Sequence, residues 1–160
     1  MGLSITVCET LVENNYRVRV ALGQGISGRD SVLSAISQLH GVNIVEQVNY
    51  ARDLSEAKLV ITAAGTSLWE ALCLGKHTIA LIVADNQKGQ ASRAAELTHR
   101  IRVIDAQEDP TRVEEIPQLL AELYRVDDRN ASLSLELAHG TTRLVDGILK
   151  LMSSESEKTG

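Results

Sequence analysis

Aromatic residues are nearly absent from this 160-residue sequence, which contains one Trp, three Tyr and no Phe. Its core must therefore be built from Leu, Ile, Val and Ala, which suits buried parallel strands covered by helices. Hydrophobic residues make up 44% of the chain and charged residues 23%, as in ordinary soluble globular proteins. The length predicts one domain with a sizeable core.

Cysteine, positive charge and long apolar runs are also scarce, and each absence argues against a class of protein. The two cysteines, Cys8 and Cys73, are too few for a disulfide scaffold, so two buried thiols are expected. The net charge of −5 argues against nucleic acid or an anionic membrane as the main partner. No apolar run approaches the roughly 18 residues of a membrane span, and no secretory leader is recognised. A cytoplasmic location is therefore expected.

Apolar segments alternate with amphipathic ones along the chain. The apolar segments predict strands at Arg17–Leu22, Asn43–Val48, Leu59–Ala63, Thr78–Ala84 and Arg102–Ile104. The amphipathic segments predict helices at Leu3–Asn14, Asp30–Leu39, Arg52–Ala57, Ser67–Leu74, Gln87–Leu97, from beyond Pro110 to Leu123, and from Asn130 to Met152. This alternation predicts an α/β domain over residues 1–152, with a Rossmann-like parallel sheet and helices on both faces, and a disordered tail at 153–160.

The predicted domain opens with a helix, whereas an alternating fold of this kind normally opens with a central strand. Without that strand, backbone groups inside the sheet would lack partners, at a cost of about 1–3 kcal/mol for each buried group. Either the strands pair in another order, or polypeptide from outside this chain fills the position.

The first candidate site is the segment Gly23–Gly28, which reads G-Q-G-I-S-G and fits the pattern G-x-G-x-x-G. It follows a predicted strand and precedes a predicted helix, and Glu46 lies near the end of the next strand, where an acidic partner for a ribose is expected. Three interpretations remain open. The segment is a glycine-rich turn, a phosphate-facing loop for some nucleotide, or the dinucleotide fingerprint of an NAD-binding oxidoreductase that uses Gly23, Gly25 and Gly28.

The second candidate is the segment from Thr62 to Glu70, which reads T-A-A-G-T-S-L-W-E. Gly65 allows a ligand to approach the backbone, and the free N–H groups at a helix start attract phosphate oxygens. The hydroxyls of Thr66 and Ser67 can donate to the same oxygens, and Glu70 can accept hydrogen bonds from a ribose. Ser67 and Glu70 also fit a capping box, in which they only satisfy donors at the helix end.

The third candidate is the segment Ala84–Gln87, which reads A-D-N-Q and directly follows an apolar strand. In one interpretation Asp85 or Asn86 caps the following helix. In the other, Asn86 and Gln87 reach into the same crevice as the second segment, because ligands bind at the carboxyl ends of parallel strands.

Taken together, Thr62–Lys76 and Ile82–Gln87 resemble the C-terminal half of the UDP-sugar hydrolase of pseudaminic acid biosynthesis. That family includes relatives labelled as spore-coat polysaccharide biosynthesis proteins, and it is similar to the GT-B N-acetylglucosaminyltransferase of peptidoglycan synthesis. The resemblance covers Leu3 to Met152, and its specific part is Leu59–Gln87. It implies the nucleotide-binding half of a GT-B-like enzyme, with a UDP-sugar as ligand and hydrolysis or sugar transfer as the reaction. No cofactor or metal is expected.

The resemblance also implies a role for each site residue. The implied contacts are with the pyrophosphate for Gly65, Thr66 and Ser67, with the ribose for Glu70, with the uracil for the backbone near Val48, with the sugar or phosphates for Asn86 and Gln87, and along the crevice wall for Gly23 and Gln24.

Catalytic residues are not assigned, because in the resembled family an N-terminal domain supplies the catalytic histidine. His40, His77, His99 and His139 match no catalytic position, and the first strand of the family's C-terminal half is missing. We therefore expect catalysis to need a separate N-terminal chain, with a homo-oligomer as another possible assembly. The alternatives are an NAD-binding oxidoreductase domain and a non-catalytic subunit of a split glycosyltransferase.

Overall fold

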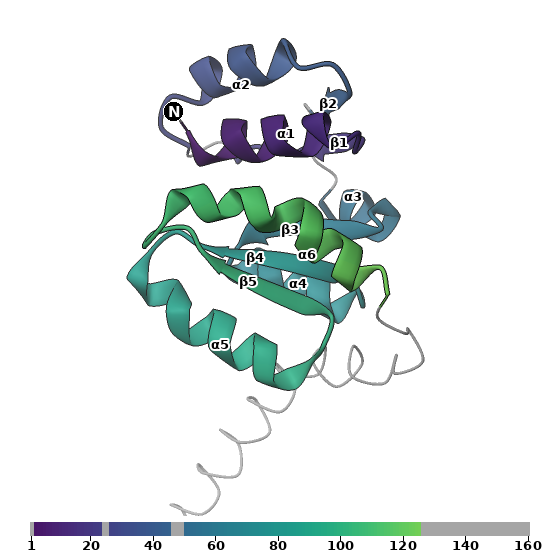
Figure 1. The fold of residues 1–160 in the computed structure, drawn as a ribbon, viewed down its shortest axis with the longest axis vertical. Helices are drawn as coiled ribbons and strands as arrows, with labels where there is room; N and C mark the ends of the chain where they lie inside the picture. The colour runs from purple at the N-terminus through teal and green to yellow at the C-terminus, as the bar shows by residue number, and fades with distance from the viewer. Residues whose placement is uncertain (1, 24–25, 46–49, 126–160) are drawn as a thin grey trace, which may run out of the picture.

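The computed structural model describes residues 2–23, 26–45 and 50–125 (Figure 1). The helix predicted from Asn130 to Met152 and the tail predicted at 153–160 lie outside these ranges. Gln24, Gly25, Glu46 and Val48 of the candidate sites also lie outside them.

Each strand predicted from an apolar run is present. The strands are β1 (Val18–Val20), β2 (Val42–Ile44), β3 (Leu59–Ala63), β4 (His77–Ile82) and β5 (Ile101–Asp105). The helices are α1 (Leu3–Glu13), α2 (Arg29–Ser37), α3 (Tyr50–Glu56), α4 (Thr66–Cys73), α5 (Lys88–Leu97) and α6 (Ile116–Leu123), with 3₁₀ turns η1 (Asp85–Gln87) and η2 (Pro110–Glu115). Within the described ranges, no helix is both long enough and apolar enough to cross a lipid bilayer.

The strands form two parallel sheets. The larger has the order β3-β4-β5, in which Ala63 lies opposite Leu81 and Ile82 lies opposite Asp105. The smaller is β1-β2. No ladder joins β1 to β3 within the described residues, so the sheet is divided there. The parallel pairing confirms the predicted fold class.

Helices cover both faces of the larger sheet. Side chains from α1, η2 and α6 pack on one face, and those from α4 and α5 pack on the other. The first face buries Val7, Leu11, Ile79, Leu81, Ile104, Val113, Ile116, Leu120 and Leu123. The second buries Ala64, Leu68, Leu72, Ala80, Ile82, Ala91, Ala94 and Ile101. Aliphatic residues and alanine thus build both clusters, as the scarcity of aromatic residues predicts.

Helix α1 connects the two sheets. Its Val7 and Leu11 belong to the core of the larger sheet, whereas Cys8 packs with Val20 and Ile36 around the smaller one. Figure 1 shows α1 beside α6 with the same direction, and the strands that follow α1 and α3 return toward the side on which α1 begins. The carboxyl ends of the strands in both sheets therefore lie on one side of the molecule.

The thiol of Cys8 should be chemically inert in the folded protein. Only 4% of Cys8 is exposed, and burial, with a smaller contribution from the charge of Glu9, raises its pKa to about 11. At pH 8 we expect iodoacetamide to label Cys8 only after unfolding, since the thiolate is the reactive form. Peptide mapping by mass spectrometry, with and without urea, measures this. Fast labelling of Cys8 in the native protein would contradict the packing of α1.

The same shift makes stability depend on pH above about 9. Between the unfolded pKa of 9.0 and the folded pKa of about 11, the folded state keeps a proton that the unfolded state has lost. The contribution of Cys8 to the free energy of unfolding is therefore fully present below the lower value and falls as the pH rises. Cys8→Ala should reduce this slope, measured by urea unfolding at several pH values.

Candidate functional site

The second and third candidate segments lie side by side at the carboxyl edge of the larger sheet. Strand β3 continues into Ala64 and Gly65 before α4 begins, and the neighbouring β4 continues into Val83 and η1. The N–H of Ala64 donates to the carbonyl of Leu81 at 2.9 Å, which extends the β3–β4 ladder into this edge. Gly65, Thr66 and Ser67 on one strand end therefore lie next to Asn86 and Gln87 on the other.

The start of α4 leaves its first N–H groups available to a ligand. Gly65 occupies the N-cap position, and its carbonyl accepts from the N–H of Leu68 at 3.2 Å. Within the described residues no side chain caps this helix, and no acceptor bonds the N–H of Thr66 or Ser67. The capping-box interpretation of Ser67 and Glu70 is therefore wrong, because the helix begins at Thr66 and places Ser67 inside its first turn.

The surroundings of Gly65 are open. A Cβ atom added to Gly65 would meet no atom within 4 Å, and its backbone at φ −108° and ψ −150° is extended. Neither packing nor a left-handed backbone therefore requires glycine here. Thr66 and Glu70 are exposed and Ser67 is half-buried, so Glu70 does not point into the protein interior.

The third segment is held in place by its own glutamine. The Oε1 atom of Gln87 accepts from the N–H of Val83 at 2.9 Å, which closes the turn around η1. Ala84 and Gln87 are the N-cap residues of η1 and α5, and no side chain among the described residues caps either helix. The interpretation of Asp85 or Asn86 as a cap of the following helix is therefore wrong. Asn86 is exposed, and the amide nitrogen of Gln87 remains able to donate to a ligand.

Lys88 is a charged residue at this edge that the sequence analysis did not identify. It is the first residue of α5, and its Nζ lies 3.3 Å from Oδ1 of Asp85 and 3.7 Å from Oδ2 of Asp105. The hydrogen bond to Asp85, followed by the charge of Asp105, raises the pKa of Lys88. Its position in the sequence could have identified it, since Lys88 directly follows Gln87. Lys88 places a positive charge beside the β3–α4 and β4–η1 loops, although the carboxylates of Asp85 and Asp105 offset part of that charge.

The two loops are also connected through their helices. The indole nitrogen of Trp69 in α4 donates to Oε1 of Gln90 in α5 at 3.0 Å. Because each helix directly follows one of the loops, this bond holds the two helix starts in a defined relation.

The first candidate segment contributes less to the described site. Gly23 follows β1, is exposed, and lies at the carboxyl end of its strand, but in the smaller sheet. Gly28 has φ +67° at the N-cap of α2, a left-handed conformation that favours glycine. This local requirement accounts for Gly28 without a dinucleotide. Gln24, which was predicted to line the crevice, and Val48, which was predicted to face the base, lie outside the described residues.

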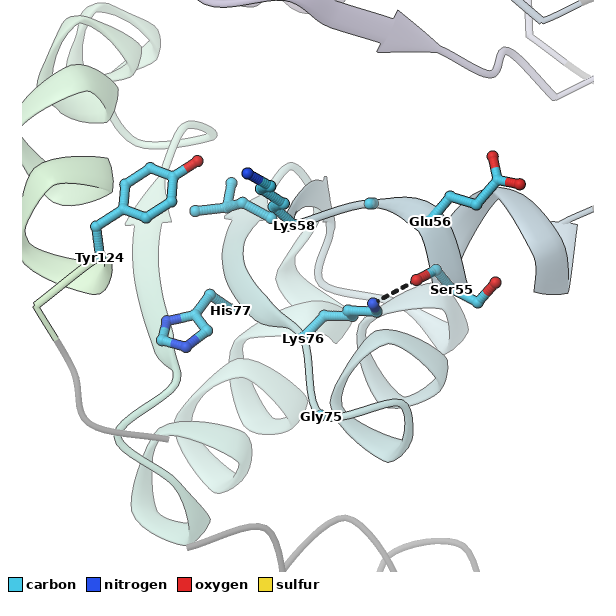
Figure 2. A pocket seen from close by; sticks show the side chains of 9 residues that line it. Ser55, Glu56, Lys58, Gly75, Lys76, His77 and Tyr124 are labelled. Atoms are coloured by element: carbon cyan, nitrogen blue, oxygen red, sulfur yellow. Dashed lines mark hydrogen bonds between the residues drawn. The ribbon is translucent and has the colours of Figure 1, made fainter. Parts of the chain in front are cut away.

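A cavity of about 440 Å³ lies at the opposite, amino edge of the larger sheet. Figure 2 shows Lys58, His77 and Tyr124 on one side of this cavity, and on the other Lys76, whose Nζ donates to the carbonyl of Ser55 at 2.6 Å. The cavity precedes β3 and β4, so it is separate from the candidate site. No group of three or more potential metal-ligating side chains occurs in the part of the chain that the structure describes.

Comparison with solved structures supports the fold. The chain is similar to the crystal structure of the glycotransferase of kitacinnamycin, with a TM-score of 0.62 and 21% sequence identity. The similarity covers 91% of this chain but only 38% of that one, so the chain spans well under half of the transferase's length. This likeness shows that the chain has the fold of one part of that longer transferase.

The comparisons also decide between the families considered from the sequence. A search among curated proteins finds no match. The matches that are found support neither the pseudaminic acid hydrolase nor an NAD-binding oxidoreductase. The family model of the glycosyltransferase family 28 C-terminal domain matches residues 4–155, almost the whole chain. The chain therefore belongs to the glycosyltransferase family 28 C-terminal domain family.

Proposed function

We propose that the crevice between the β3–α4 and β4–η1 loops binds the diphosphate of a UDP-sugar, and that the chain is the donor-binding half of a glycosyltransferase. The observation that carries this proposal is the uncapped start of α4, which lies beside Asn86 and Gln87 on the neighbouring strand end. The family membership supports it, because a domain of this kind belongs to enzymes that transfer sugars.

The pyrophosphate fits the start of α4. The N–H groups of Thr66 and Ser67 have no partner among the described residues, and the helix dipole makes this end positive. The hydroxyls of both residues can add further donors. The open space over Gly65 lets phosphate oxygens approach the backbone, where any side chain would intrude.

The remaining residues fit the sugar parts of the ligand. Glu70 is exposed one turn into α4, where its carboxylate can accept two hydrogen bonds from the hydroxyls of a ribose. Asn86 and Gln87 lie at the neighbouring strand end, and the amide nitrogen of Gln87, which bonds no acceptor among the described residues, can donate to phosphate or sugar oxygens, as can that of Asn86. Gly23 would line the crevice from β1. The expected roles of Gln24 along the crevice wall and of the backbone near Val48 against the uracil concern positions outside the described residues.

Sugar transfer requires an acceptor site and a catalytic base that we have not assigned to any described residue. The similar transferase is a much longer protein, of which this fold makes up 38%. We therefore propose that a separate N-terminal catalytic chain completes the enzyme. Co-purification of this chain with such a partner would support that arrangement.

Isothermal titration calorimetry with UDP tests the proposed site. We expect millimolar or tighter binding to the full chain, weakened about tenfold or more in both Thr66→Ala and Glu70→Ala. A hydrogen bond to a charged group contributes about 1.5–3 kcal/mol, and 1.4 kcal/mol corresponds to a factor of ten.

Glu13→Ala is the matched control, because Glu13 is an exposed acid at the far end of α1. It removes the same charge as Glu70→Ala and should leave UDP affinity unchanged. Equal affinity in the wild type, Thr66→Ala and Glu70→Ala would reject the proposal. A fluorescence change of NADH in a protein that does not bind UDP would instead favour the oxidoreductase alternative.

A further inference from the structure

The cavity at the amino edge of the larger sheet carries basic side chains. Its volume of about 440 Å³ lies within the range of about 300–1,000 Å³ typical of small-molecule sites. The end of α3, the starts of β3 and β4 and the end of α6 form its walls, and Lys58, Lys76, His77 and Tyr124 line it (Figure 2). The proposed nucleotide site lies at the other ends of the same strands, so the two places are distinct.

The register of the sheet brings the two lysines together. Leu59 at the start of β3 pairs with His77 at the start of β4. Lys58 and Lys76 each directly precede one of these paired residues, and neighbouring parallel strands lie about 4.8 Å apart. Two ammonium groups from distant parts of the sequence therefore occupy the walls of one cavity.

Lys76 is held in place by bonds on both sides of it. Gly75 has φ +68° at the end of α4, a left-handed conformation that favours glycine at this position. The N–H of Lys76 donates to the carbonyl of Ala71 at 3.0 Å, and its carbonyl accepts from Oγ1 of Thr78 at 3.1 Å. Its Nζ donates to the carbonyl of Ser55 at 2.6 Å. An ammonium group has three donors, so Lys76 can also bond a ligand.

The positive charge of the two lysines is not balanced by a carboxylate of the described residues. No ion pair within those ranges includes Lys58 or Lys76. Glu56 lines the same cavity, but its carboxylate binds Arg52 and Arg19, each at 2.9 Å, and these bonds lower its pKa. Figure 2 shows this carboxylate pointing away from Lys76. The cavity therefore favours an anion, although the whole chain has a net charge of −5.

Tyr124 adds an aromatic ring to the wall. Its N–H donates to the carbonyl of Leu120 at 3.0 Å, and the preceding Leu123 is fully buried, so the end of α6 is anchored in the core. The side chain of Tyr124 is nevertheless 59% exposed, and it lies on the same side of the cavity as Lys58 (Figure 2). An apolar group attached to a bound anion can pack against this ring.

We propose that this cavity binds a phosphate monoester, with Lys58 and Lys76 bonding the phosphate and Tyr124 covering the esterified group. A phosphate monoester carries a charge of about −1.5 to −2 at pH 7 and three strong acceptor oxygens, which suits two ammonium groups from different strands. A carboxylate has a single charge and accepts in one plane, so it fits this arrangement less well. The inference does not depend on the nucleotide site.

NMR titration of the isotopically labelled full chain with phenyl phosphate tests the proposal. We expect the amide signals of Lys58, Gly75 and Lys76 to shift, with a dissociation constant in the millimolar range or below. Lys58→Gln and Lys76→Gln should each weaken binding about tenfold or more, since charge-assisted hydrogen bonds are roughly twice as strong as neutral ones. Inorganic phosphate should bind more weakly than phenyl phosphate, and Tyr124→Ala should remove that difference.

Arg93→Gln is the matched control, because Arg93 is an exposed cation on α5 and its loss removes the same charge. It should leave phenyl phosphate affinity unchanged. Lys58 is exposed and bonds no side chain among the described residues, so Lys58→Gln should also keep the melting temperature of the wild type. That variant keeps the test decisive even if Lys76→Gln fails to fold.

A phosphate monoester can be a soluble molecule or the headgroup of a lipid, and sedimentation with phosphatidylcholine vesicles that contain phosphatidic acid distinguishes the two. Sedimentation that is lost in Lys58→Gln would assign a lipid, and binding of phenyl phosphate alone would assign a soluble ester. The proposal is overturned if neither kind of binding depends on Lys58, or if acetate binds as tightly as the ester. Shifts confined to Gly65 and Thr66 would place the ester at the nucleotide site and also overturn it.

Discussion

Gln87→Glu is expected to weaken UDP binding by about tenfold or more while leaving the melting temperature nearly unchanged. The new carboxylate can still accept from the N–H of Val83, so the turn around η1 keeps its bond. The substitution removes the only donor group of the side chain and adds a negative charge beside the proposed diphosphate. The lost bond and the repulsion each oppose binding, and a charged hydrogen bond alone contributes about 1.5–3 kcal/mol.

Calorimetry with UDP and thermal unfolding of the same preparation measure the two effects. Gln38→Glu is the matched control, because it makes the same change at an exposed position after α2. It should leave UDP affinity unaltered. If Gln87→Glu binds UDP as tightly as the wild type, the amide nitrogen of Gln87 does not contact the ligand. If the melting temperature of Gln87→Glu falls by several degrees, the new carboxylate does not replace the amide oxygen as the acceptor for the N–H of Val83.

Leu68→Ala is expected to lower the free energy of unfolding by about 3 kcal/mol, within the range of 2–5 kcal/mol typical of buried leucines. Leu68 of α4 is completely buried, and it packs in one core cluster with residues of the larger sheet and of α5. Its neighbours include Ala64, Ala80, Ala91 and Ala94, and such short side chains cannot move far enough to fill the space that Leu68 would leave. Most of the cavity should therefore persist.

Urea unfolding followed by circular dichroism measures this loss. Leu74→Ala is the control, because 46% of Leu74 is exposed and the same truncation should cost little there. Equal midpoints for the two variants would show that α4 does not pack as described. Since Leu68 lies in the first turn and a half of α4, the outcome also tests how firmly the proposed phosphate-binding end of the helix is held.

The strongest sequence predictions came from continuous apolar runs. The strand Leu59–Ala63 has the predicted bounds, because a run of apolar and small residues begins directly after Lys58 and leads into Gly65. The loops that follow β3 and β4 were predicted to converge, and the parallel pairing of those strands places them together. That convergence follows from topology alone.

Predictions that depended on the reach of single side chains were less successful. Ser67 fitted a capping box, but α4 begins one residue earlier, and this shift moves its hydroxyl away from the cap position. Asp85 and Asn86 are common capping residues, yet Gln87 closes that turn by reaching back to Val83. Differences of one residue or one rotamer decide such bonds, and residue type does not specify them.

The sequence alone determined the alternating elements, the parallel α/β class and the segments that follow the strands, because hydrophobic periodicity and short connections constrain all three. Only the tertiary structure showed that the sheet divides between β1 and β3, that α1 bridges both parts, and that Lys88 lies between Asp85 and Asp105. These features depend on which strands pair and on contacts between residues far apart in the chain. Local pattern carries no information about such contacts, since the same strand reads alike whether its edge is paired or open.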